Sequence, residues 1–220
     1  MNSNKKTARI AGVLFLAATA AYILGNGLIE SVLNNPDYLI HVYPNRTKVI
    51  EGMLLEFINS AAVVGIAITL FPILKKHNET LALGYVSFRV IEAIILIVGA
   101  IIPLLLISLS KEYIETGAPD ASYFQTIGTL AIKGKLLAFQ LAMLVLGLYS
   151  LLFCYLFYQS KLIPRLLSVL GFIGYASLLT SALLEIFGYS AGMLLFLPGA
   201  LFEILLPLWL IVKGFKEKTS

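Results

Sequence analysis

The sequence predicts an all-α membrane protein, a polytopic bundle of six transmembrane helices with both termini in the cytoplasm. Of its 220 residues, 59% are hydrophobic and 13% are charged. A soluble domain is roughly 45–50% apolar and about 25% charged. Apolar runs long enough to cross a bilayer, which takes about 20 residues, recur along the chain. We expect one transmembrane domain, residues 1–220, with spans at about 10–33, 49–74, 81–108, 136–158, 166–187 and 191–212.

The first run follows Lys5, Lys6 and Arg9, and such a basic start could belong to a secretory signal peptide. However, the run is longer than the apolar region of an ordinary signal peptide. It also ends in Asn26 and Glu30 rather than at small residues that a signal peptidase would cleave. We therefore expect it to be retained as the first helix.

Connections that contain proline or charge separate the later runs. Pro36 and Pro44 interrupt the chain after the first span, and the charged turn 75–79 ends the second. The segment 123–135, before the fourth span, is only partly apolar, so it either lies at the membrane interface or extends that span. The charged residues of 213–218 follow the sixth span.

Lysine and arginine are distributed unequally between the two ends of the predicted spans. Cytoplasmic loops carry an excess of these residues, which places both termini in the cytoplasm. The same distribution accounts for the net charge of +4, so we expect no nucleic-acid partner. The basic residues on the predicted cytoplasmic side are Lys5, Lys6, Arg9, Lys75, Lys76, Lys161, Arg165, Lys213, Lys216 and Lys218.

Two ionisable residues, Arg89 and Glu92, interrupt the third run near its middle. At a rise of about 1.5 Å per residue they lie roughly 10–16 Å inside the membrane. Ionisable residues at that depth are costly, which makes them candidates for a functional site. The two are one helical turn apart, so they could instead neutralise each other, or bind Glu203 of the sixth span, and serve only to hold the helices together.

Other polar residues lie on single faces of the spans, mostly toward their outer ends. Because lipid cannot satisfy polar groups, these faces must point into the bundle. We therefore expect a carboxylate-rich cavity that opens to the outside and binds a small molecule, a lipid or a cation. The expected ligand-binding residues are Glu56, Asn59, Arg89, Glu92, Glu203, Glu30, Asn26, Glu185 and Gln140.

Within this set, Arg89 would anchor an anionic group or act as an internal counter-ion, and Glu56, Glu92 and Glu203 would handle protons or cations. Glu56 and Glu203 have no basic neighbour along their own helices. We expect Lys133 and Lys135 to be anchors at the membrane interface.

The faces of the helices also indicate how they pack. Tyr22, Asn26 and Glu30 recur every four residues and share one side of the first span. Small residues on the fifth and sixth spans, among them Gly174 and Gly199, would let these two helices approach closely.

Motifs of known catalytic chemistry are absent from the sequence, which has no GxSxG, no HExxH and no Walker-type loop. Cys154 is the single cysteine, and His41 and His77 fall in predicted loops, so we expect no metal site and no cofactor. Catalytic residues remain unassigned, as does the oligomeric state. Two alternatives stay open: an intramembrane enzyme that uses two carboxylates as acid and base on a lipid-like substrate, and a structural subunit of a membrane complex.

Three segments of the chain resemble a bacterial integral-membrane family catalogued as domain of unknown function 4386. They are 8–14, the block from 74–79 through 88–92, and 202–215. The resemblance covers nearly the whole chain and is most specific at Arg89, Glu92 and 209–215. It implies a multi-pass protein of the bacterial cytoplasmic membrane, but no activity, substrate or catalytic residue.

Overall fold

The computed structural model describes residues 3–117, 121–189 and 193–216, and within these it contains helices and no strands. Six of the helices are long and apolar enough to cross a membrane. This confirms the predicted all-α class and the six candidate membrane-spanning helices. In chain order the elements are α1 (Ser3–Leu33), the short α2 (Tyr38–His41), α3 (Arg46–Leu74), α4 (Glu79–Glu115), α5 (Ala121–Ser160), α6 (Arg165–Ile186), the 3-10 turn η1 (Met193–Phe196) and α7 (Leu197–Val212).

Local sequence signals fix several helix ends. The side chain of Asn78 accepts a hydrogen bond from the Leu81 N–H at 2.9 Å and so caps the start of α4. Gly188 and Gly214 follow the ends of α6 and α7 with φ of 82° and 75°. This left-handed conformation suits glycine and ends both helices.

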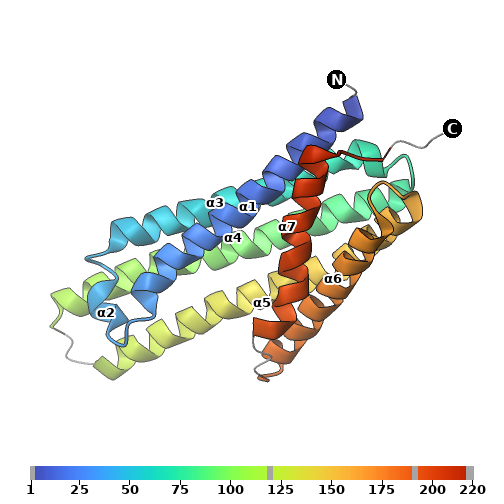
Figure 1. Ribbon diagram of the computed structural model, residues 1–220. Helices are drawn as coiled ribbons and strands as arrows, with labels where there is room; N and C mark the ends of the chain where they lie inside the picture. The colour runs from blue at the N-terminus through green and yellow to red at the C-terminus, as the bar shows by residue number, and fades with distance from the viewer. Residues whose placement is uncertain (1–2, 118–120, 190–192, 217–220) are drawn as a thin grey trace.

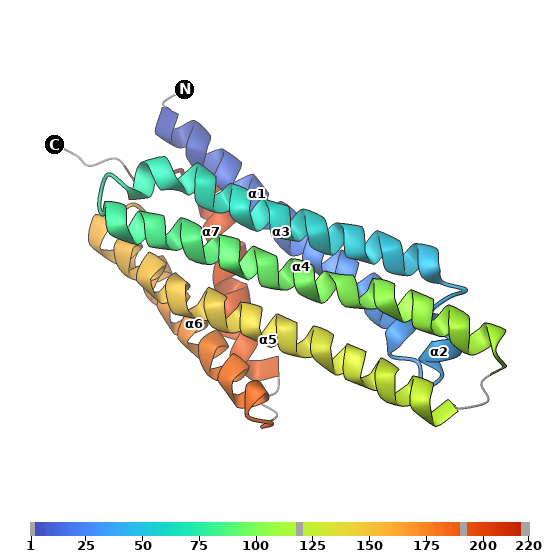
Figure 2. The ribbon, with the colours of Figure 1, turned by 180° about the vertical axis from the view of Figure 1, so that it is seen from behind.

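The six long helices form a closed ring in chain order (Figures 1 and 2). Each one packs against the next, from α1 with α3 through to α6 with α7, and α7 returns to contact α1. In both views α3, α4 and α5 run side by side, whereas α6 and α7 are inclined to them. Helix α1 begins and α7 ends at one end of the bundle, and α2 lies at the other.

The larger apolar core fills the end of the ring where α1 begins. It combines buried side chains of all six long helices, among them Leu70, Phe157 and Leu210. The segment after α7 also packs there, because the Lys216 N–H donates to the Leu162 carbonyl at 2.8 Å and Phe215 lies beside Phe157. This end of the ring is therefore closed by packed side chains.

Glycines allow two pairs of helices to approach closely. A methyl group added at Gly174 of α6 would lie 2.7 Å from the Cα of Gly199 in α7, which confirms the predicted contact. A methyl group added at Gly52 of α3 would lie 2.7 Å from the carbonyl oxygen of Gly25 in α1.

The segment 123–135 is the first part of α5, a continuous helix of 40 residues. The segment is therefore continuous with the helix of the predicted fourth span and does not form a separate helix. Helix α4 is longer than the predicted span 81–108, beginning at Glu79 and ending at Glu115. Residues 190–192, at the start of the predicted sixth span, lie outside the described residues.

Candidate functional site

Two adjacent cavities lie inside the ring of helices. The α2-side cavity, of about 250 Å³, is lined by α1, α3, α4, α5 and Asn34. The central cavity, of about 200 Å³, is lined by all six long helices and η1. The residues that line both cavities, and so mark their junction, are Tyr22, Asn59, Leu96 and Phe139.

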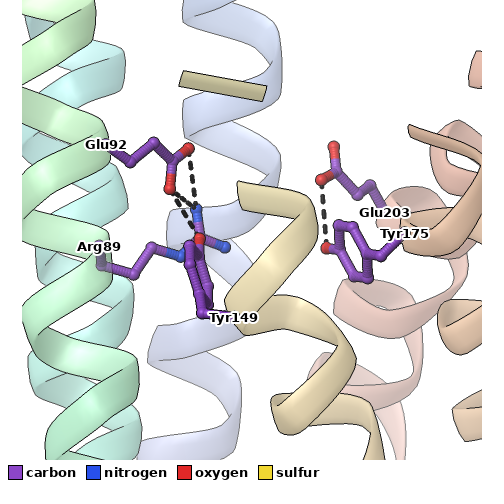
Figure 3. A network of polar contacts seen from close by, with 5 residues as sticks. All are labelled: Arg89, Glu92, Tyr149, Tyr175 and Glu203. Carbon is purple, nitrogen blue, oxygen red and sulfur yellow. Dashed lines mark hydrogen bonds and ion pairs between the residues drawn. The ribbon is translucent and has the colours of Figure 1, made fainter. Parts of the chain in front are cut away.

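One wall of the central cavity carries an ion pair within α4 (Figure 3). Arg89 Nη1 lies 3.2 Å from Glu92 Oε2 and 3.4 Å from Oε1. The Tyr149 hydroxyl of α5 donates a second hydrogen bond to Glu92 Oε2 at 2.6 Å. Arg89 and Glu92 are only 4% and 2% exposed. The Glu92 carboxylate therefore has both a counter-ion and a neutral donor inside the protein.

Arg89 is held on its remaining sides by aromatic rings. Its guanidinium carbon lies 5.9, 5.6 and 5.2 Å from the ring centroids of Phe15, Tyr85 and Tyr149. A guanidinium at this distance is attracted to the face of an aromatic ring. These contacts and the ion pair hold Arg89 in place, while its buried Nε–H has no hydrogen-bond partner among the described residues.

The opposite wall of the central cavity carries Glu203 of α7. The Tyr175 hydroxyl of α6 donates to Glu203 Oε1 at 3.2 Å. Figure 3 shows the carboxylates of Glu203 and Glu92 pointing toward the same space from opposite sides. Among the described residues, no ion pair includes Glu203. Its one hydrogen-bond partner within that part of the chain is thus a neutral phenol.

In the α2-side cavity a lysine joins three helices. Lys135 Nζ of α5 lies 3.0 Å from Glu56 Oε1 of α3 and donates to Asn26 Oδ1 of α1 at 3.1 Å. The sequence-based expectation that Lys135 is an anchor at the membrane interface was therefore wrong, and Glu56, which has no basic neighbour along its own helix, receives one from α5. Residues two apart on a helix point about 200° away from each other, so Lys133 is exposed while Lys135 faces the cavity.

The junction of the cavities combines stacked rings and a free amide. The rings of Tyr22 and Phe139 are stacked with their centroids 5.6 Å apart. Asn59 is only 8% exposed and lines both cavities. In the described part of the chain its side chain makes no hydrogen bond. Asn59 therefore offers a donor and an acceptor to whatever occupies the junction.

Seven of the nine residues expected from the sequence line the two cavities, and two do not. Gln140 is buried in α5, with its Oε1 unpaired among the described residues, and Glu185 is half-buried near the end of α6. The seven that line a cavity are Asn26, Glu30, Glu56, Asn59, Arg89, Glu92 and Glu203.

Sequence reasoning missed the aromatic part of the lining. Phe15, Phe139 and Phe196 line the central cavity, together with Tyr22 and Tyr175. The spacing of Tyr22 with Asn26 and Glu30 placed it on their side of the helix, but it was not included among the expected ligand-binding residues. The phenylalanines carried no signal, because a phenylalanine in an apolar run has the same hydropathy whether it faces lipid or a cavity.

Each cavity holds two carboxylates for one base. These are Glu30 and Glu56 with Lys135 in the α2-side cavity, and Glu92 and Glu203 with Arg89 in the central cavity. When all these groups are ionised, each cavity carries one uncompensated negative charge. Within the described residues no group of three or more His, Cys, Asp or Glu side chains is placed to hold a metal ion.

Comparison with curated proteins and with solved structures finds no match. A family model matches residues 10–214, which include every residue that lines the two cavities. The match therefore covers most of the chain and the whole candidate site. This chain belongs to the family described as domain of unknown function 4386.

Proposed function

We propose that this multi-pass membrane protein binds a small organic cation in its central cavity, with Glu203 as the counter-ion. The observation that carries the proposal is the isolation of Glu203, which faces the cavity and has only the Tyr175 hydroxyl as a partner within the described residues. Glu203 is half-buried, and a carboxylate that is withdrawn from water without a basic partner is unfavourable. A bound cation supplies the missing charge.

The charge of the cavity favours a cation over an anion. Arg89 is the one basic residue in the described lining, and Glu92 and three aromatic rings already surround it. An anionic ligand at Arg89 would lie beside two carboxylates, those of Glu92 and Glu203. In this proposal the Arg89–Glu92 pair therefore serves mainly to join α4 to α5 through Tyr149.

The lining of the cavity favours an organic cation. Tyr175, Phe15 and Phe196 contribute rings from three different elements, and aromatic faces attract ammonium groups. Small-molecule sites are mostly apolar, with a few placed polar groups, and typically measure about 300–1,000 Å³. At about 200 Å³ the central cavity suits a small amine.

The direction of access follows from the proposed orientation in the membrane. The excess of Lys and Arg near the end where α1 begins supports cytoplasmic termini, in the cytoplasmic membrane of a bacterium. That end is filled by packed apolar side chains. The ligand then enters from the outside through the α2-side cavity, where Glu30 is exposed.

Binding of pentylamine to the purified full chain in detergent tests the proposal by titration calorimetry. Pentanol, which has the same chain and no charge, is the matched ligand control. We expect pentylamine to bind and pentanol to bind far more weakly. A charge-assisted hydrogen bond contributes about 1.5–3 kcal/mol, so Glu203→Gln should weaken pentylamine binding roughly tenfold to a hundredfold.

The matched protein control is Glu112→Gln, at an exposed position of α4 outside both cavities, which should bind pentylamine as the wild type does. The Gln variant at position 203 keeps the hydrogen bond from Tyr175 and should stay folded. Equal binding of pentylamine and pentanol, or undiminished pentylamine binding by folded Glu203→Gln, would contradict the proposal.

A further inference from the structure

The two cavities are arranged as successive compartments along the bundle axis. Three helices line both cavities with residues seven positions apart. In each pair, one residue lines only the central cavity and the other lines only the α2-side cavity. Seven residues of helix rise about 10 Å. The pairs are Thr19 and Asn26 on α1, Val63 and Glu56 on α3, and Glu92 and Gly99 on α4.

The two compartments have the same charge balance. In the central cavity Glu203 is the carboxylate without a basic partner among the described residues. In the α2-side cavity Lys135 pairs with Glu56, so the excess negative charge there belongs to Glu30. Two uncompensated carboxylates thus lie one in each compartment.

The junction between the compartments can hold an extended chain. Tyr22, Phe139 and Leu96 present apolar surface to both cavities, which suits methylene groups. The buried Asn59 side chain lies at the same level and has no hydrogen-bond partner in the described part of the chain. Its carbonyl oxygen can accept from an N–H group of a ligand that passes between the compartments.

From these observations we infer that the ligand is a linear aliphatic diamine or polyamine that occupies both cavities at once. One ammonium group lies against Glu203 and the aromatic rings of the central cavity. The chain passes Asn59 at the junction, and a second ammonium group enters the α2-side cavity, about 10 Å of helix rise away, where Glu30 supplies the excess negative charge. A dication of this length matches the two excess negative charges. The inference rests on the proposed function, because it uses Glu203 as the first cation site.

The test compares three ligands on the full-length protein in detergent by titration calorimetry. Octamethylenediamine spans both compartments, octylamine has the same chain with one charge, and tetramethylenediamine has two charges but is too short. We expect octamethylenediamine to bind about tenfold more tightly than either of the other two, since it alone satisfies both carboxylates. Glu30→Gln should weaken the binding of octamethylenediamine to the affinity of octylamine and leave the affinity for octylamine unchanged.

Glu30 is exposed, so Glu30→Gln is expected to fold, and Glu112→Gln again serves as the matched control. If octylamine binds as tightly as octamethylenediamine, and Glu30→Gln changes neither, the two-cavity ligand is wrong while single-amine binding at Glu203 stands. If neither monoamines nor diamines bind, both the inference and the proposed function fail.

Discussion

Removing Arg89 tests whether its pair with Glu92 holds the bundle together. In Arg89→Met the Glu92 carboxylate, 2% exposed, loses its counter-ion and keeps only the Tyr149 hydroxyl. Breaking a buried ion pair by removing one partner destabilises a protein by about 3–5 kcal/mol. For a chain of this size each kcal/mol lowers Tm by about 2–4 °C, so we expect a fall of about 10 °C.

A second substitution separates the lost charge partner from the lost packing. In Arg89→Met combined with Glu92→Leu, neither charge remains, and replacing a buried ion pair by apolar residues is often neutral for stability. The double variant still lacks the cation–π contacts of Arg89, and their loss costs about 0.5–2 kcal/mol of stability. We expect the double variant to regain more than half of the Tm lost in Arg89→Met.

Thermal unfolding in one detergent, followed by tryptophan fluorescence or circular dichroism, measures both variants against the wild type. Glu112→Gln, far from the pair, should unfold as the wild type does and reports the effect of altering an exposed carboxylate. A double variant no more stable than Arg89→Met would refute this account, because the uncompensated carboxylate would not be the cause of the loss.

Three further changes test other parts of the structure. Gly174→Ala should lower the free energy of unfolding, measured by chemical unfolding, by about 1–3 kcal/mol, since the new methyl group would lie 2.7 Å from the backbone of Gly199. The control Gly84→Ala, whose methyl group would have nothing within 4 Å, should leave the protein equally or more stable. Equal effects of the two substitutions would exclude the close approach of α6 and α7. Lys135→Met should lower Tm, because it leaves Glu56 without a counter-ion, and adding Glu56→Gln should restore part of the lost Tm. If Tm is not restored, the ion pair is not what Lys135 contributes to stability. Lys76→Cys should react with an impermeant thiol reagent only after cells are permeabilised, whereas labelling of intact cells would reverse the proposed orientation.

The six helices could be predicted because lipid imposes a strong constraint on sequence. A spanning helix must satisfy its backbone internally and present apolar side chains over about 20 residues. Run length and the charged turns therefore predicted six long apolar helices without any knowledge of packing. The segment 123–135 was ambiguous because it is only partly apolar; of its two lysines, Lys133 is exposed and Lys135 faces the bundle.

The candidate site was predictable only where polarity marked it. Glu92 and Glu203 stood out because carboxylates at that depth are rare. The partner of Glu56 lies 79 residues away in the chain, so no local pattern could reveal it. Gln140 has a polar side chain yet lines neither cavity, since the rotation of a helix about its axis depends on packing that its own sequence does not contain.

The position of a bromine-labelled pentylamine, located by anomalous scattering in crystals of the protein, shows whether Glu203 binds the ammonium group. We expect the ligand nitrogen within hydrogen-bond distance of the Glu203 carboxylate, with the alkyl chain among Phe15, Tyr175 and Phe196 of the central cavity. In Glu203→Gln crystals the label should be lost or much reduced. A label found only on the membrane-facing surface, or one equally occupied in the central cavity of both proteins, would contradict the role assigned to Glu203.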